Sequence, residues 1–268
     1  MAKTIIFGNQ KGGVAKTTST YNVAMQLALR DYRVLMVDSD PQASLTIVCG
    51  KAPEDYIGRN LHTLLYELDQ KVDIHDCILS LNDILPKDSE GSLSLIPCEI
   101  QMASGDTTFA SRPKNTEYLK MVLNKIKDEY DFICIDCPPS LGIISLNDIF
   151  ASDFIVGCVE PTYQAYRGIS EYIKTLFNYI NIYEIDTKFL GIIISKTTHS
   201  RDSFDLVEKY ENEFSVLGKI PSSVEVTKGE IDGVPVSTRK PSHLSSLMYA
   251  DIAEKIIYKI MDFERNEE

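Results

Sequence analysis

Ten residues near the N-terminus constrain the fold more than any other part of the chain. They lie between an apolar strand pattern at residues 3–8 and an amphipathic helix pattern at 17–30, and they read Asn9-Gln10-Lys11-Gly12-Gly13-Val14-Ala15-Lys16-Thr17-Thr18. A glycine-rich turn of this kind aims backbone N–H groups at one spot, where the helix N-terminus adds partial positive charge. A lysine followed by threonine suits the phosphates and an accompanying Mg²⁺ ion. The segment predicts a phosphate loop in an α/β fold.

The rest of the chain alternates short apolar runs with longer amphipathic stretches, a pattern typical of a mostly parallel sheet. Strands are predicted at residues 3–8, 33–38, 93–97, 131–136, 154–160, 188–196 and 216–221, all buried on both faces. Helices are predicted at residues 17–30, 117–129, 141–150, 164–182, 203–214 and 241–261. We expect one α/β domain over residues 1–268, with a twisted sheet of about seven or eight strands and helices on both faces.

Residues 50–92 carry scattered acids and two prolines without a clean period. We interpret this stretch as a surface insertion with one or two short helices. No window approaches the roughly 18 apolar residues of a membrane span, and the six cysteines are expected to be reduced thiols. Together these features predict a cytoplasmic protein.

The net charge of −12 disfavours a nucleic-acid partner, because phosphate binding needs concentrated lysine and arginine. The charge is uneven, however. Residues 188–240 hold eight basic and eight acidic side chains, so a basic stripe can still form there.

Acidic residues follow two of the predicted strands. Asp38 and Asp40 end the strand at 33–38, and Asp136 ends the strand at 131–136. Ligands of open parallel sheets bind at the carboxyl ends of the strands. Three carboxylates are therefore predicted beside the phosphate loop.

These motifs resemble those of a known family. The loop departs from the simple G-x-x-x-x-G-K-[ST] pattern at Gln10 and Ala15, but its Lys-Gly-Gly-x-x-Lys-Thr-Thr run resembles the deviant Walker A motif of the ParA/MinD ATPases. The segments at 38–42 (Asp-Ser-Asp-Pro-Gln) and 136–142 (Asp-Cys-Pro-Pro-Ser-Leu-Gly) resemble the switch and Walker B segments of ParA/Soj-type partition ATPases. An Ile-Pro strand end at 220–221 and a Gly-Val-Pro-Val turn at 233–236 also match.

The resemblance implies hydrolysis of ATP with Mg²⁺. Lys16 and Lys11 would act on the phosphates, Lys11 from the partner subunit, and Asp40 would orient the attacking water. The nucleotide would be held by Lys11, Gly12, Gly13, Val14, Ala15, Lys16, Thr17, Thr18, Asp38, Asp136, Pro221 and Ser223. Thr17 would bind Mg²⁺ directly, Asp38 and Asp136 would do so through water, and Pro221 and Ser223 would lie near adenine.

The resemblance also implies partners: a homodimer when ATP is bound, a ParB-like centromere-binding activator, and double-stranded DNA bound without sequence preference at the nucleoid. The DNA-binding candidates are Lys188, Lys196, Arg201, Lys219, Lys228, Arg239 and Lys240. Because the chain opens at the phosphate-loop strand, the N-terminal DNA-reading domain of longer plasmid ParA proteins is not expected.

Three alternatives belong to the same superfamily or share its loop. A MinD-like membrane protein would need a basic amphipathic C-terminus, whereas residues 261–268 hold four acids and one base. A nitrogenase-type reductase would need a cysteine pair for a cluster, but Cys134 and Cys137 would point to opposite faces of a strand. A ParA-like scaffold that positions another cargo has no distinguishing signal in the sequence.

Overall fold

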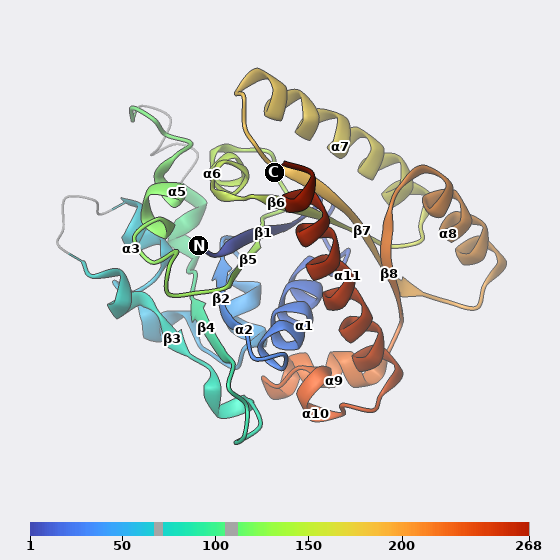
Figure 1. Ribbon diagram of the computed structural model, residues 1–268, viewed down its shortest axis with the longest axis horizontal. Coiled ribbons are helices and arrows are strands. Elements are labelled where there is room, and N and C mark those ends of the chain that lie inside the picture. Colours follow the sequence, from blue (N-terminus) through green and yellow to red (C-terminus); the bar gives the residue numbers. More distant parts are fainter. Residues whose placement is uncertain (67–71, 105–111, 268) are drawn as a thin grey trace.

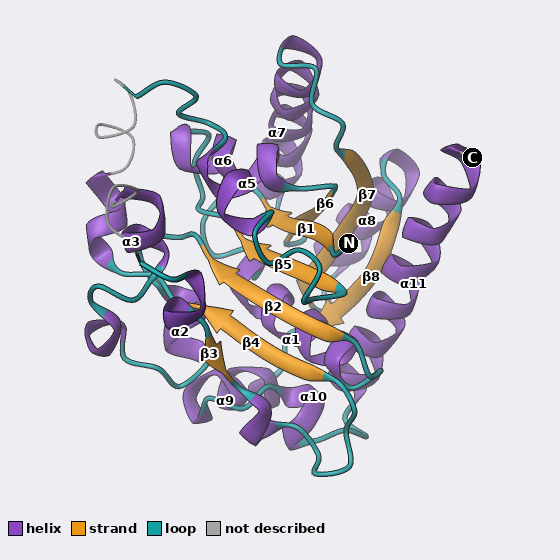
Figure 2. Cartoon of the chain, turned by 60° about the vertical axis from the view of Figure 1, so that its left-hand side comes forward, coloured by secondary structure: helices purple, strands orange, loops and turns teal. Residues whose placement is uncertain are grey.

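The computed structural model describes residues 1–66, 72–104 and 112–267, and within them the chain forms one eight-stranded sheet (Figures 1 and 2). The strand order is β3-β4-β2-β5-β1-β6-β7-β8. The strands are β1 (Lys3–Gly8), β2 (Arg33–Asp38), β3 (Leu79–Ser80), β4 (Ser92–Ile96), β5 (Phe132–Asp136), β6 (Phe154–Val159), β7 (Lys188–Thr197) and β8 (Val216–Pro221). Only the β3–β4 pair is antiparallel among these neighbours. The predicted α/β class is confirmed.

Helices cover both faces of the sheet, as predicted (Figure 1). They are α1 (Lys16–Ala28), α2 (Ser44–Val48), α3 (Leu61–Tyr66), α5 (Tyr118–Leu123), α6 (Ile143–Ala151), α7 (Tyr163–Ile182), α8 (Arg201–Glu213), α9 (Val224–Asp232), α10 (Val236–Arg239) and α11 (Leu244–Glu267). Short 3₁₀ turns occur at residues 53–56, 74–77, 82–84 and 100–104.

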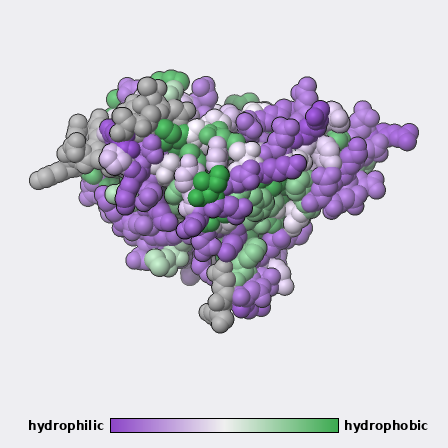
Figure 3. Space-filling model, turned by 90° about the horizontal axis from the view of Figure 1, so that it is seen from above, coloured by the Kyte–Doolittle hydropathy of each residue, from purple (hydrophilic) through white to green (hydrophobic). Residues whose placement is uncertain are grey.

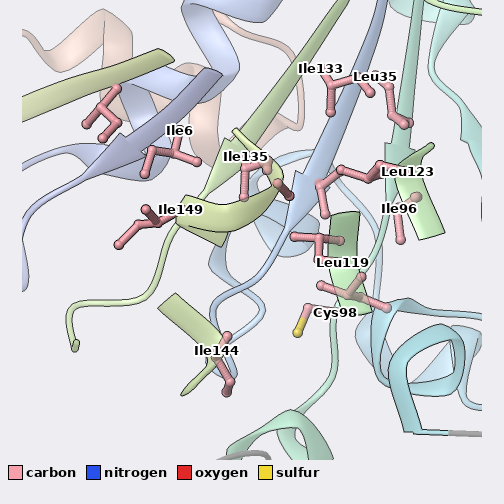
Figure 4. Close-up of a cluster of buried hydrophobic side chains, with 14 of the residues drawn as sticks. Ile6, Leu35, Ile96, Cys98, Leu119, Leu123, Ile133, Ile135, Ile144 and Ile149 are labelled. Atoms are coloured by element: carbon pink, nitrogen blue, oxygen red, sulfur yellow. The ribbon is translucent and has the colours of Figure 1, made fainter. Parts of the chain in front are cut away.

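The core has two halves because strand side chains alternate between the faces. In β1, Ile5 and Phe7 pack with α1 and α11, whereas Ile6 packs with α5, α6 and α7. Figure 4 shows part of the second half, where Ile149 of α6 lies near Ile6 of β1 and Ile135 of β5. The polar surface outside these layers fills most of the face in Figure 3, with apolar residues in small separate areas.

Two predicted helices differ from the observed ones, and several observed elements were not predicted. The helix predicted at 117–129 ends at Leu123, because the backbone bonds then tighten to i→i−3, as in the bond from Ile126 N to Leu123 O at 3.0 Å. The helix predicted from residue 241 starts at Leu244, where the His243 ring nitrogen Nδ1 accepts a bond from Ser245 N at 3.1 Å. The elements that were not predicted are the helices α2, α9 and α10 and the two-residue strand β3.

The prediction that all seven strands are buried on both faces is wrong for β8. This strand forms the edge of the sheet, and its Lys219 is exposed. An edge strand has a neighbour on one side only, so it can carry a charged residue without burying it.

The stretch 50–92 contains more than surface structure. It supplies the edge strand β3, and Leu61, Leu65 and Leu81 are at most 1% exposed. Residues 67–71 lie outside the described part of the chain. The described remainder therefore contributes to the core as well as to the surface.

Candidate active site

The phosphate loop, residues 9–18, connects β1 to α1 at the carboxyl edge of the sheet. Gly13 and Ala15 have positive φ angles of 77° and 64°, and a Cβ atom added at Gly12 or Gly13 would meet nothing within 4 Å. No side chain caps the N-terminus of α1. The first N–H groups of a helix have no partner inside it, so the loop presents open backbone donors suited to an anion.

Lys16 and Thr17 lie at the start of α1 with different partners. Lys16 is only 7% exposed, and its Nζ donates to the Lys11 carbonyl at 3.4 Å. The Thr17 hydroxyl donates to Asp136 Oδ2 at 2.6 Å, and the Thr18 hydroxyl donates to Glu230. Thus a buried cation lies beside the cradle, and Thr17 connects the loop to the neighbouring strand end.

Asp38 and Asp136 lie side by side, because they are register partners at the ends of β2 and β5. Asp38 Oδ2 accepts bonds from both Thr46 N and Thr46 Oγ1 at 2.7 Å. Asp136 Oδ1 is buried without a partner in the described residues. Burial raises the pKa of Asp38 to about 7 and that of Asp136 to about 8. The Asp40 carboxylate raises the pKa of Asp38 further, and the carboxylates of Asp38 and Asp40 do the same for Asp136.

The donors present here fit a magnesium ion. Mg²⁺ prefers oxygen ligands and usually takes only one or two carboxylates from the protein, together with water and phosphate. Thr17 Oγ1 and the unpartnered Asp136 oxygen are such ligands, and a cation would offset the buried negative charge. Thr17, Asp136 and Asp38 are therefore the residues that could hold it.

Asp40 lies two residues beyond the end of β2, in a turn at the rim of this group. Its backbone N–H donates to Asp38 Oδ1 at 3.3 Å, and its own Oδ1 accepts a bond from Gln42 N at 2.9 Å. The side chain is partly exposed, unlike those of Asp38 and Asp136. It can reach water while the other two remain covered.

Lys11 is held within its own subunit. Its Nζ lies 2.6 Å from Glu160 Oε1 and 3.3 Å from Thr162 Oγ1. The side chain is 32% exposed, so the ion pair is at the rim of the loop and not beneath it. The two loop lysines therefore occupy different environments.

Pro221 and Ser223 line a cavity of about 110 Å³ beside the phosphate loop. Ala15, Thr18 and Tyr249 line the same cavity. The Tyr249 hydroxyl is fully buried and makes no hydrogen bond in the described residues. The structure thus places the two residues predicted for adenine next to the loop.

Two of the seven DNA-binding candidates lie apart from the others. Lys188 begins β7, at the end of the strand away from the phosphate loop, and its Nζ lies 2.7 Å from Asp186. Lys196 lies near the other end of β7, and its Nζ donates to the Gly13 carbonyl at 2.5 Å. Lys196 therefore belongs to the surroundings of the phosphate loop.

Four other candidates already have acidic partners. Lys219 lies 2.6 Å from Glu211. Glu225 is approached by three cations at 3.3, 3.0 and 2.9 Å, namely Lys228, Arg239 and Lys240. Arg201, the first residue of α8, makes no ion pair with the residues that the structure describes.

Three side chains of the site were not predicted. Thr46 binds Asp38, Glu160 binds Lys11, and Asp148 of α6 accepts a bond from Ser39 Oγ at 2.8 Å. Thr46 and Glu160 carry no local signal, since they follow their partners by 8 and 149 residues. An acid within the apolar run of α6 was the one available sign of Asp148.

Comparisons with known proteins identify the family. A family model described as an AAA domain matches residues 2–189. Soj of Bacillus subtilis, a sporulation initiation inhibitor protein, is 31% identical over 260 residues, which cover 96% of this chain and 98% of Soj. The chromosome partitioning protein ParA of Myxococcus xanthus is 31% identical over 243 residues, covering 88% and 81%. The chain belongs to the ParA/Soj-type ATPases of the AAA domain family.

A solved structure agrees with this assignment at the level of the fold. A cobyrinic acid a,c-diamide synthase from Mycobacterium smegmatis, solved with an ATP analogue and magnesium, superposes with a TM-score of 0.79 at 24% identity. The match covers 96% of the ParA/Soj-type chain and 94% of the synthase. In the described residues of this chain, no helix has the length and apolar character needed to cross a membrane.

Proposed function

We propose that this ParA-like ATPase binds Mg-ATP on the phosphate loop and hydrolyses it to ADP and phosphate. One observation carries the proposal: Thr17 donates to Asp136 beneath an open glycine cradle, and the second Asp136 oxygen is buried without a partner. A buried carboxylate in this state is stabilised by a cation. The structurally similar synthase, solved with an ATP analogue and magnesium, supports the same ligands.

The chain supplies the other chemical groups. Lys16 and the N–H groups of Gly12 to Thr17 would bind the phosphates and stabilise the charge that develops there. Asp40, partly exposed at the rim, would orient the attacking water. Bound Mg²⁺ would neutralise phosphate charge, held by Thr17 and, through water, by Asp38 and Asp136.

Dimer formation would follow from ATP binding. Lys11 has a carboxylate partner at the rim, and nothing in its position buries it. A γ-phosphate presented by a second subunit would compete with Glu160 for this lysine, because phosphate carries the greater charge. ATP would therefore join two subunits, and hydrolysis would release them.

Within this proposal, the ATP-bound dimer binds double-stranded DNA without sequence preference and segregates plasmid or chromosomal DNA with a ParB-like activator. Membership of the ParA/Soj-type family and the partitioning ParA relative support this part. Arg201 makes no ion pair with the described residues, and the pairing of Lys219, Lys228, Arg239 and Lys240 weakens their attraction for phosphate.

That same pairing favours a second candidate, a ParA-like scaffold that positions a cargo other than DNA. A MinD-like membrane role has less support. The apolar stripe of α11, with Ile252, Ile256 and Ile260, is at most 3% exposed and packs in the core, so it is not presented to a lipid surface.

The test is retention of duplex DNA by the protein with ATP, with ADP and without nucleotide, over a salt series. Partition function predicts retention with ATP only and a steep loss with salt, with a log–log slope of about −0.9 for each phosphate contact. Arg201→Ala should weaken retention, whereas Lys188→Ala, at the opposite sheet edge, should not. Equal retention without nucleotide contradicts the partition proposal, and no retention at any salt selects the cargo scaffold.

A further inference from the structure

Asp148 is a buried carboxylate to which the proposed reaction assigns no role. It lies in the interior of α6 and is 0% exposed. Its Oδ1 accepts the bond from Ser39 Oγ, and the Cys137 thiol also lies against the carboxyl group. Its Oδ2 has no partner among the described residues by hydrogen-bond geometry. Asp148 is thus an acid with few stabilising contacts.

Such a residue is unfavourable for stability. Burying a carboxyl group costs free energy unless its hydrogen bonds are replaced, and burial raises the pKa of Asp148 to about 7. Its helix already packs on the sheet through Ile149, which lies near Ile6 and Ile135 (Figure 4). An apolar residue at position 148 would avoid this cost, so the presence of a carboxyl group there points to a role other than stability.

The two partners of Asp148 belong to two different strand ends. Ser39 lies between Asp38 and Asp40, and its backbone N–H donates to the Asp136 carbonyl at 3.1 Å. Cys137 directly follows Asp136, and it is 2% exposed. One side chain on α6 therefore contacts both the turn that carries Asp40 and the strand end that carries Asp136.

We propose that Asp148 is a positioning residue for ATP hydrolysis, which holds the Asp40 turn and the Asp136 strand end at a fixed separation through Ser39 and Cys137. The inference rests on the proposed role of Asp40. Misplacing a reacting group by about 1 Å can cost on the order of 10²-fold in rate. Among the described residues, Asp148 has no hydrogen bond or ion pair with Lys16 or the loop glycines, so its loss should slow turnover and leave nucleotide affinity intact.

The experiment compares Ser39→Ala, Asp148→Ala, their double variant and Asp148→Asn. The control is Ser152→Ala, which removes an equally buried hydroxyl that donates to the Ile149 carbonyl just after α6, away from the site. For each protein, kcat and KM for Mg-ATP, the Kd for a fluorescent ATP analogue and the melting temperature are measured.

Ser39→Ala and Asp148→Ala should each lower kcat by roughly ten- to a hundredfold with Kd changed less than about threefold. The double variant should be no slower than the slower single variant, because both remove one contact. Asp148→Asn should recover much of the rate, since its amide oxygen still accepts the Ser39 bond. Ser152→Ala should turn over normally.

Normal kcat in Ser39→Ala, with only a lower melting temperature, would overturn the proposal, even if Asp148→Ala failed to fold. Asp40→Ala, assayed in parallel, distinguishes failure of the positioning role from failure of the proposed function. Slow Asp40→Ala with fast Ser39→Ala and Asp148→Ala rejects the positioning role alone. Turnover of Asp40→Ala at the wild-type rate rejects the proposed function of that site, and the positioning role with it.

Discussion

Beside the phosphate loop, three acids are fully buried next to one buried cation, Lys16; these acids are Asp38, Asp136 and Asp148. At α9, by contrast, three cations surround one acid, Glu225. Burial raises the pKa of each of these three aspartates to about 7 or 8. The hydrogen bond from Lys240, with those of its neighbours, instead lowers the pKa of Glu225 to about 2.

The difference concerns what each region can bind. The carboxylate cluster (Asp38, Asp136 and Asp148) has three acids beside one buried cation, Lys16, so a further cation that arrives with an anionic nucleotide improves its electrostatics. The cations around Glu225 are already paired, so DNA phosphates must compete with that carboxylate. We therefore expect tight binding of a magnesium nucleotide at the carboxylate cluster, and weak, salt-sensitive binding of DNA by the cations around Glu225.

The largest effect is expected when Lys16, the buried cation of the loop, is removed. Removing one partner from a buried charge contact costs about 2 kcal/mol or more, so Lys16→Ala should bind a fluorescent ATP analogue at least about 30-fold more weakly. Lys11→Ala is the matched control, because its side chain lies at the rim with Glu160. Equal losses in the two variants would remove the distinction between a buried and a rim lysine.

A second test uses pH on the nucleotide-free protein. An aspartate in the unfolded chain has a pKa near 3.9, and the folded values for Asp38, Asp136 and Asp148 are higher. The folded state therefore binds protons more tightly. The contribution of these three aspartates to stability is fully present below about pH 4. It is lost as the pH rises toward 8, through their pKa values in the folded protein. The melting temperature should fall over that window by about 2 °C or more.

Mg-ATP should make this fall in melting temperature smaller. Asp136→Asn should also make it smaller, because the amide has no proton to lose. Asp88→Asn, at an exposed position, is the control and should follow the wild type. A melting temperature that rises from pH 5 to 8 in the nucleotide-free protein would show that the cluster is not short of positive charge.

The smallest effect concerns the cations around Glu225. Glu225→Gln frees Lys228 and Lys240 from their shared carboxylate, whereas Arg239 keeps a second partner, Asp232, at 3.1 Å. ATP-dependent DNA retention should therefore strengthen a few-fold. The salt slope should steepen by about 0.9 for each cation that then reaches a phosphate. Glu90→Gln removes the same charge at an exposed site. If it strengthens retention equally, net charge and not the cluster is responsible.

The sequence predicted which segments form the site, but it did not predict all of the side-chain contacts within it. Residues 9–18 and the acids at 38 and 136 are local signals, because the strand–loop–helix order puts them at one sheet edge. Glu160, Thr46 and Asp148 reach the site from distant positions through tertiary packing, which no local pattern encodes. The basic residues show the same limit, since their ion pairs with Glu211 and Glu225 depend on how α8 and α9 pack.

The central claim is that ATP moves Lys11 from Glu160 to a second subunit and so forms a dimer that hydrolysis dissolves. The most direct measurement is the mass of Asp40→Ala by size exclusion with light scattering, in Mg-ATP, with and without DNA. We expect a stable dimer for Asp40→Ala, because ATP stays intact, and a monomer that still binds nucleotide for Lys11→Ala combined with Asp40→Ala. A nucleotide-bound monomer of Asp40→Ala, or a dimer of the double variant, would contradict the account.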